Sequence, residues 1–124
     1  MSAYSFDEFK KILGTEDGLY IAKSSATDRV LEVYPDKTRS EAEEFIKVGL
    51  GHLKQEDYCN TLILKDCRKS DVYGLIYDKR HWYIKFLLEY DNEYDEWFIA
   101  NISFHPPRWD MKTISGTVIK REKS

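Results

Sequence analysis

Two neighbouring stretches of alternating side chains constrain the fold of this chain most strongly. From Trp82 to Glu89 apolar and more polar residues alternate, and a second alternation runs from Phe98 to His105. A period of two is typical of a β-strand with one buried face. Because the segment 89–96 between them is too polar for a core, we predict that the two strands form a β-hairpin.

The register of this hairpin decides which side chains share a face of the sheet. We expect the turn to be centred near Asn92, which places Tyr83 opposite Asn101. The same alignment places His81 opposite Ser103. The apolar face of the second strand then consists of Phe98, Ala100, Ile102 and Phe104. The opposite face, the main functional clue in the chain, gathers the side chains of Tyr83, Lys85, Asn101, Ser103 and His105.

Two capping boxes predict helices upstream of the hairpin. Ser5 and Glu8 are spaced for reciprocal hydrogen bonds at a helix start, and Gly14 is a natural stop. Thr38 and Glu41 repeat the pattern before a run of apolar residues at spacings of three and four. We therefore expect a short helix to begin after Ser5 and a longer helix to begin after Thr38.

Shorter patterns predict the remaining elements. Leu19–Ala22 is expected as a short strand, whereas the apolar run in Asp28–Val33 fits a helix or a strand. Acidic residues at the start of Gln55–Ile63 favour a helix there. Val72–Tyr77 and the β-branched stretch Thr113–Lys120 are predicted strands.

The order of these elements, helices first and antiparallel strands later, predicts the fold class. We expect an α+β protein in which an antiparallel sheet of about four strands carries helices on one face, with the other face available for function. At 124 residues the chain is expected to form a single domain. Its expected parts are an N-terminal extension (1–38), a helical part (39–66) and the antiparallel sheet (71–120).

Neither cysteine spacing nor hydropathy points to a cofactor or a membrane. Cys59 and Cys67 lack the spacing of metal ligands, so we expect free thiols, no metal and no cofactor. The first residues carry no secretory leader, and no run approaches the roughly 18 apolar residues of a membrane span. We therefore expect a cytoplasmic protein.

Charge is distributed unevenly along the chain. The formal net charge of −3 argues against a general nucleic-acid binder, which needs cations to displace counterions from phosphates. Basic residues nevertheless outnumber acidic ones between Lys65 and Lys85, whereas the hairpin loop is strongly acidic. A basic side and an acidic tip are therefore expected.

The polar residues around the hairpin suit metal-independent cleavage of RNA, in which the 2′-hydroxyl attacks its own phosphate. His105 can act as general acid or base, while Lys85 and Arg68 can stabilise the charged phosphorane. Tyr83 can position the substrate or donate a proton. The other candidates for contacts with RNA are Lys69, Arg80, His81 and Arg108.

Four motifs resemble the MqsR-like toxins of bacterial type II toxin–antitoxin systems. They are Leu53–Tyr58, Asp71–Tyr73, Trp82–Phe86 and Ile102–Pro106. The resemblance covers roughly residues 40–107 and implies a RelE-like fold, a cognate antitoxin, and metal-independent cleavage of mRNA, either free or on the ribosome. It also implies roles for two strands: Tyr83 and Lys85 match the Tyr-x-Lys strand of the family, in which the tyrosine belongs to the active site. Residues 103–105 match its Ser-Phe-Lys or Ser-Phe-His strand end.

A second hypothesis assigns the chain no catalysis. In this interpretation it is a small acidic inhibitor or adaptor, encoded by a phage or mobile element, that binds a basic protein. The aromatic residues Trp97 and Trp109 would contribute to the interface. The remaining contacts would come from carboxylates and tyrosines at the acidic tip, namely Glu89, Tyr90, Asp91, Glu93, Tyr94, Asp95 and Glu96. The enzyme needs Lys85 and His105 on one accessible face, whereas the adaptor needs only the tip.

Overall fold

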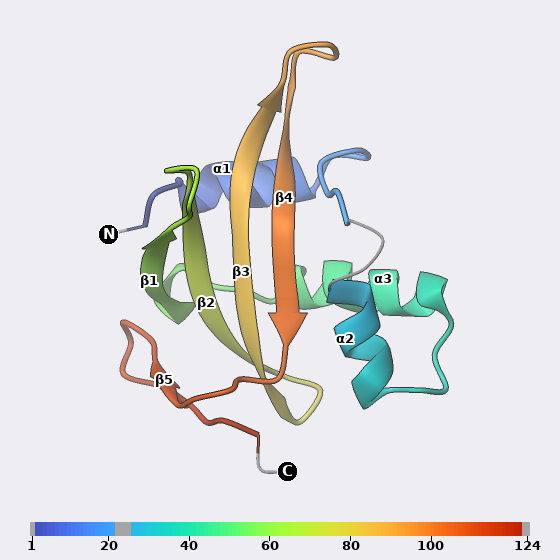
Figure 1. The fold of residues 1–124 in the computed structure, drawn as a ribbon, viewed down its shortest axis with the longest axis vertical. Helices are drawn as coiled ribbons and strands as arrows, with labels where there is room; N and C mark the ends of the chain where they lie inside the picture. The colour runs from blue at the N-terminus through green and yellow to red at the C-terminus, as the bar shows by residue number, and fades with distance from the viewer. Residues whose placement is uncertain (1, 22–25, 123–124) are drawn as a thin grey trace.

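The computed structural model describes residues 2–21 and 26–122, which form an α+β fold (Figure 1). Within these ranges the helices are α1 (Phe6–Leu13), α2 (Ala26–Val33) and α3 (Arg39–Gly51). An antiparallel sheet has the strand order β1 (Tyr58–Ile63), β2 (Lys69–Tyr77), β3 (Arg80–Asp91) and β4 (Glu96–His105). A smaller antiparallel pair consists of β5 (Met111–Lys112) and β6 (Val118–Ile119). The predicted fold class, helices packed against an antiparallel sheet, is confirmed.

The helices begin where the capping residues predict. The Ser5 hydroxyl accepts the Glu8 N–H at 3.3 Å, and at α3 the capping box of Thr38 and Glu41 is complete. The ambiguous segment after residue 25 is helical as α2. Apolar faces of these helices bury Phe9, Val30 and Ile46 against the sheet, so the main core lies between the helices and one sheet face. No helix of the described residues is both long and apolar enough to cross a bilayer.

The prediction of a helix that continues through Ile63 is wrong. Residues 55–57 form only a single 3₁₀ turn, and strand β1 follows from Tyr58. The Asp57 carboxylate accepts the Lys54 N–H at 2.9 Å, which closes this turn on itself. The segment after it is rich in residues of low helix propensity, and pairing with β2 supplies its backbone hydrogen bonds. The sheet therefore has an additional edge strand, which was not predicted because the acidic residues at the start of the segment favoured a helix.

The predicted hairpin exists as β3 and β4, but its predicted register is wrong. Tyr83 pairs with His105 instead of Asn101, and Lys85 pairs with Ser103. Asp91 and Glu96 are the last pair before the loop. The loop lies later in the chain than expected because the Asp91 carboxylate accepts the N–H groups of residues 93 and 94, at 2.9 and 3.3 Å.

A β-bulge in β4 makes a second difference from strict alternation. The register shifts between Lys85 and Leu87, which pairs with Ala100, so two residues of β4 lie opposite one residue of β3. On the side of the bulge toward the end of β4, here called below it, Ile102 faces the helices as predicted. On the side toward the hairpin tip, here called above it, Ile99 does so. The expected apolar face of Phe98, Ala100, Ile102 and Phe104 is therefore divided between the two faces of the sheet.

The last predicted strand, Thr113–Lys120, instead contains the turn and the second strand of a small hairpin, whose first strand is β5. Thr113 donates its N–H to the Thr117 carbonyl at 2.9 Å, and Gly116 takes a φ of +90° in the turn between β5 and β6. This hairpin packs on the sheet face that lies opposite the helices, hereafter the open face. There Met111 and Ile119 form a second cluster with Val72 and Tyr83, so the open face is covered in part.

A buried carboxylate ties the N-terminal segment to the sheet. Asp71 is 0 % exposed and accepts the N–H groups of Ala3 and Tyr4 at 2.8 and 3.0 Å, as well as the Thr61 hydroxyl at 2.6 Å. Farther along, the predicted strand at Leu19 is reduced to a single parallel bridge with Ile99, and Ala22 lies outside the described residues. The residues that precede α1 therefore belong to the fold.

We predict that Asp71→Asn lowers the free energy of unfolding by roughly 2–3 kcal/mol, because the amide lacks the charge that these three donors stabilise. Urea denaturation monitored by circular dichroism measures this. Asp66→Asn is the matched control, since Asp66 is exposed and its loss leaves no buried donor unpaired. Equal stability of Asp71→Asn and the wild type would contradict the anchoring role of Asp71.

Candidate functional site

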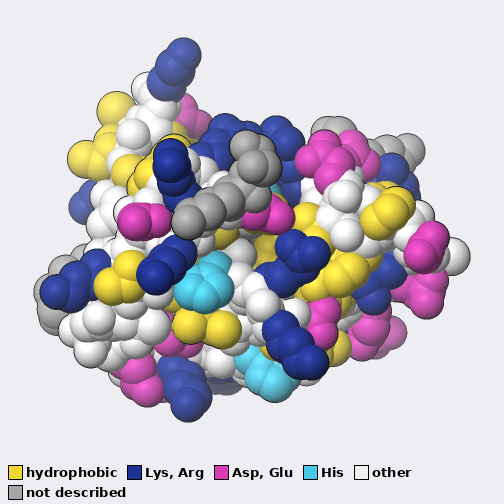
Figure 2. All heavy atoms as spheres, turned by 90° about the horizontal axis from the view of Figure 1, so that it is seen from below, with side chains coloured by type: hydrophobic (Ala, Val, Ile, Leu, Met, Phe, Trp, Pro, Cys, Tyr) yellow, Lys and Arg dark blue, Asp and Glu magenta, His cyan; other side chains and the backbone are white. Residues whose placement is uncertain are grey.

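A cavity of about 410 Å³ lies where the open face meets the C-terminal end of β4. It is lined from the sheet by Lys85, Ser103 and His105, and from α2 by Arg29. Arg108 and Trp109, which follow β4, complete its rim. We call the group Arg29, Lys85, His105 and Arg108 the cationic pocket. Figure 2, which views this end of the molecule, shows Lys and Arg side chains gathered around histidines.

His105 is held in one orientation by two contacts. Its ring stacks on its cross-strand partner Tyr83, with centroids 4.9 Å apart and an interplanar angle of 18°. Its Nδ1 lies 2.7 Å from the carbonyl oxygen of Pro106. Since a carbonyl can only accept, Nδ1 carries the proton in the neutral ring, and Nε2 is left as a proton acceptor.

Electrostatics keep this imidazole neutral. Burial lowers the pKa of His105 below its ordinary value of 6.5, and the positive charges of Arg108, Arg29 and Lys85 lower it further, while the hydrogen bond to Pro106 opposes them. At neutral pH the ring is therefore a base. A neutral base beside several cations is an arrangement suited to removing a proton next to a phosphate.

The cations of the pocket are only partly neutralised by carboxylates. Arg29 forms an exposed ion pair with Glu32 at 3.3 Å. Among the residues that the structure describes, Lys85 and Arg108 form no ion pair. An adjoining cavity of about 410 Å³ shares Arg29, His105 and Arg108 with the first, but Glu32 and Glu122 also line it. The excess of positive charge therefore lies in the first cavity, where it favours an anionic ligand.

The burial and contacts of Tyr83 favour a structural role over proton transfer by its hydroxyl. It is only 7 % exposed and packs against His105 and Trp109. Burial raises the pKa of its hydroxyl, with a smaller contribution from Cys59 and an opposing one from Arg108. The thiol of Cys59 is itself half-buried, and burial raises its pKa to about 11. The contacts of Tyr83 therefore support the positioning alternative over proton donation.

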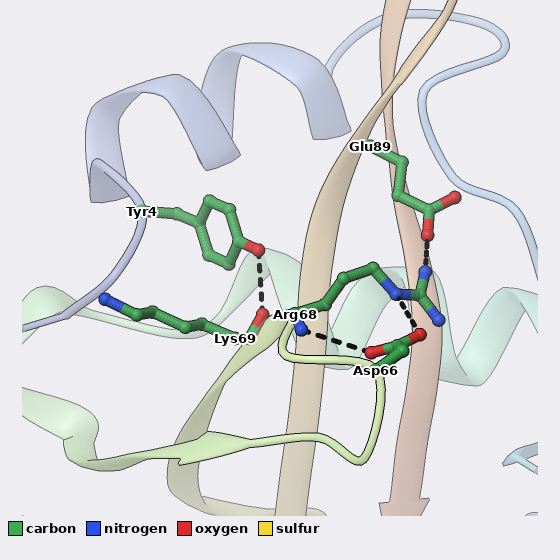
Figure 3. A network of polar contacts seen from close by, with 5 residues as sticks. All are labelled: Tyr4, Asp66, Arg68, Lys69 and Glu89. Atoms are coloured by element: carbon green, nitrogen blue, oxygen red, sulfur yellow. Dashed lines mark hydrogen bonds and ion pairs between the residues drawn. The ribbon is translucent and has the colours of Figure 1, made fainter.

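Arg68, expected beside the phosphate, lies at the other end of the sheet (Figure 3). It forms ion pairs with Asp66, at 2.7 Å, and with Glu89. Glu89 follows Lys85 by four residues of β3, a separation of about 13 Å along a strand. The structure therefore does not bring Arg68 to the cationic pocket, and two carboxylates already neutralise it.

Only one of the four expected RNA contacts, Arg108, lines the cationic pocket. Lys69 follows Arg68 at the far end of the sheet. Arg80 forms an ion pair with Glu122 at 3.2 Å. The Nδ1 of His81 accepts the Lys120 N–H at 2.9 Å, so this histidine anchors the C-terminal segment. Arg80 and His81 instead line a cavity of about 200 Å³, which shares Pro106, Pro107 and Glu122 with the cavity adjoining the pocket.

Sequence reasoning missed Arg29 as a member of the pocket. Its segment was ambiguous between helix and strand, and no pattern indicated that α2 packs beside β4. Trp109 follows two prolines in a stretch without periodicity, so nothing in the sequence placed it at the pocket either.

A second cavity lies at the acidic tip, on the open face above the bulge. This groove has a volume of about 690 Å³. Tyr90 does not line it and packs on Trp97, with centroids 5.4 Å apart, while Glu93 and Asp95 lie in the exposed turn. The lining residues are Asp17, Tyr20, Glu89, Asp91, Tyr94, Glu96, Phe98 and Ala100. Carboxylates and cations are thus separated along the same hairpin.

The arrangement, a neutral histidine in a cationic pocket, is suited to acid–base chemistry. Within residues 2–21 and 26–122, no group of three or more His, Cys, Asp or Glu side chains is arranged to hold a metal ion. No family model matches the chain, and comparison with curated proteins and with solved structures likewise gives no match. The resemblance to MqsR-like toxins therefore stays a prediction.

We predict that the pKa of His105 rises in Lys85→Met and in Arg108→Gln, because each change removes a positive charge that disfavours the imidazolium. Arg68→Gln is the matched control and leaves this pKa unchanged. NMR titration of the imidazole resonances measures all four proteins and also reports the tautomer. A wild-type pKa above 6.5, or an equal response to Arg68→Gln, would contradict this account of the pocket.

Proposed function

We propose that this protein is a cytoplasmic, metal-independent endoribonuclease that cleaves mRNA, as the resemblance to MqsR-like toxins implies. The observation that carries the proposal is the state of His105. Its Nδ1–H donates to the Pro106 carbonyl, and burial and nearby cations favour its neutral form. Nε2 is thereby available to take the proton of a 2′-hydroxyl as its oxygen bonds to phosphorus. The imidazolium formed, or water, then protonates the 5′-oxygen as its bond to phosphorus breaks.

The remaining roles follow from the pocket. Lys85 and Arg108 hold the scissile phosphate and stabilise the additional negative charge of the phosphorane. Arg108 and Arg29 replace Arg68 in this role, because they line the cavity with His105 and Arg68 does not. Tyr83 positions the imidazole by stacking on it.

We expect purified wild-type protein to cleave single-stranded RNA and to leave 2′,3′-cyclic phosphate ends. His105→Ala should lose at least a hundredfold in rate, the usual contribution of a general base. Lys85→Met should also cleave more slowly, because it lacks a cation that stabilises the phosphorane. Assays with free RNA and with mRNA on ribosomes, analysed by gel electrophoresis and mass spectrometry, measure both variants after thermal melting has confirmed that they fold.

Arg68→Gln serves as the charge-matched control, and a substrate with a single 2′-deoxy nucleotide at the cleavage site controls for the nucleophile. We expect Arg68→Gln to cleave at the wild-type rate and the deoxy substrate to stay intact. No cleavage by wild type under either condition, or full activity of folded His105→Ala, would refute the proposed function.

The pH dependence tests the protonation state that the mechanism needs. A general base is active when deprotonated, so the rate should fall as the pH drops through the pKa of His105. Because the pocket lowers this pKa below 6.5, the rate should still be maximal near neutral pH and fall only in more acidic solution. Initial rates between pH 4.5 and 8 measure this, and a fall that begins above pH 7 would contradict it.

A second candidate function is recognition of a basic protein segment by the acidic tip. It is favoured by the groove of about 690 Å³, in which carboxylates adjoin exposed aromatic rings. Such a segment could belong to a cognate antitoxin or, without any catalysis, to the target of an adaptor. Glu89→Gln and Asp91→Asn should then weaken complex formation in pull-downs while RNA cleavage is retained.

A further inference from the structure

Trp109 stands at the mouth of the cationic pocket with its indole largely uncovered. It is 57 % exposed, although tryptophan is a residue that folding usually buries. One contact steadies it, an edge-to-face packing on Tyr83 with centroids 5.9 Å apart and an angle of 71°. Pro106 and Pro107 restrict the chain that leads to it. The contact with Tyr83 therefore places the exposed ring beside the pocket.

The same cavity brings this ring together with phosphate-binding cations. Trp109 lines it with Lys85, Arg29 and Arg108. A cationic groove with an adjacent aromatic side chain is the usual arrangement for binding single-stranded nucleic acids, in which the cations contact the backbone and the ring stacks on a base. A cavity of about 410 Å³ has the size of a small-molecule site.

We propose that Trp109 is a stacking platform for one unpaired base of the RNA whose phosphate Lys85 and Arg108 hold, so that the substrate is single-stranded. This inference rests on the proposed function and adds to it a residue that selects the substrate. In a duplex each base is paired and stacked on its neighbours, and its face cannot reach the indole.

Trp97 provides an internal comparison. It is nearly as exposed as Trp109, at 53 %. It also packs on a tyrosine, because the ring centroids of Trp97 and Tyr90 are 5.4 Å apart. The cavity that Trp97 lines contains four carboxylates and one lysine, so its charge is mainly negative and repels phosphate. Exposure is thus alike at the two rings, whereas the surrounding charge differs.

The experiment uses tryptophan fluorescence in the full-length Trp97→Phe protein. There Trp109 is the exposed indole and Trp82 is fully buried. The probe is a short single-stranded RNA whose 2′-hydroxyls are methylated so that it cannot be cleaved. The same sequence as a duplex, and a strand of equal length with abasic positions, are the controls. We expect the single strand to quench the fluorescence, and the duplex and the abasic strand to do so far less.

Affinity measurements with substituted proteins separate stacking from a general loss of structure. Trp109→Ala should weaken binding of the single strand roughly ten- to a hundredfold, and Trp109→Phe should recover part of the loss because phenylalanine also stacks. Trp97→Ala is the matched control and should bind like wild type. Equal binding of single strand and duplex, or unchanged binding by Trp109→Ala, would overturn the inference.

These outcomes are distinct from those that test catalysis. If the single strand binds and quenches Trp109 but unmodified RNA is never cut, the stacking role stands and the proposed nuclease fails. If RNA is cut by His105 chemistry while Trp109→Ala binds and cleaves normally, the nuclease stands and the stacking role is refuted. Absence of any RNA binding would overturn both.

Discussion

The bulge in β4 is the constraint on which both faces of the sheet depend. Below it, the pairs Tyr83–His105 and Lys85–Ser103 direct polar side chains to the open face. Above it the side-chain alternation is reversed, so Ile99 enters the core and Phe98 turns outward to line the acidic groove. Without the extra residue one half of β4 would direct apolar side chains away from the helices. A single irregularity therefore keeps the core continuous and creates two different surfaces along one hairpin.

These two surfaces differ in charge, and the separation has a structural cause. The tip of the β3–β4 hairpin projects beyond the rest of the sheet, so its carboxylates are solvated (Figure 1). At the opposite end, α2 and the segment after β4 bring Arg29 and Arg108 to the histidine. Arg68 lies near the acidic end of the hairpin, where Asp66 and Glu89 pair with it. An anionic chain is thus attracted to one end of the hairpin and repelled by the other, which supports RNA at the pocket and a basic protein at the tip.

Both ends of the described chain reinforce the sheet that carries the pocket. Asp71 binds the segment before α1 through backbone N–H groups, a type of contact that sequence patterns do not reveal. The β5–β6 hairpin covers part of the open face, and it approaches so closely that a Cβ on Gly74 would lie 2.4 Å from the Ile119 side chain. Tyr83 is buried by this hairpin cluster as well as by His105, and this burial disfavours proton release from its hydroxyl. The covering hairpin thereby fixes the ring on which the imidazole stacks, in keeping with the positioning role proposed for Tyr83.

Local patterns in the sequence determined the elements that depend on local physics: the capped helices after Ser5 and Thr38, the β3–β4 hairpin, and the acidic tip of that hairpin. They also placed His105 and Lys85 on one face, because a period of two holds within a short strand segment. The β1 strand, the bulge and the position of Arg29 were decided only by tertiary structure. Each depends on a partner far away in the sequence: β2 for Tyr58–Ile63, β3 for the register, and β4 for α2. Backbone pairing and packing outweighed local propensity at these positions, since they satisfy hydrogen bonds and bury area that no short segment can satisfy or bury by itself.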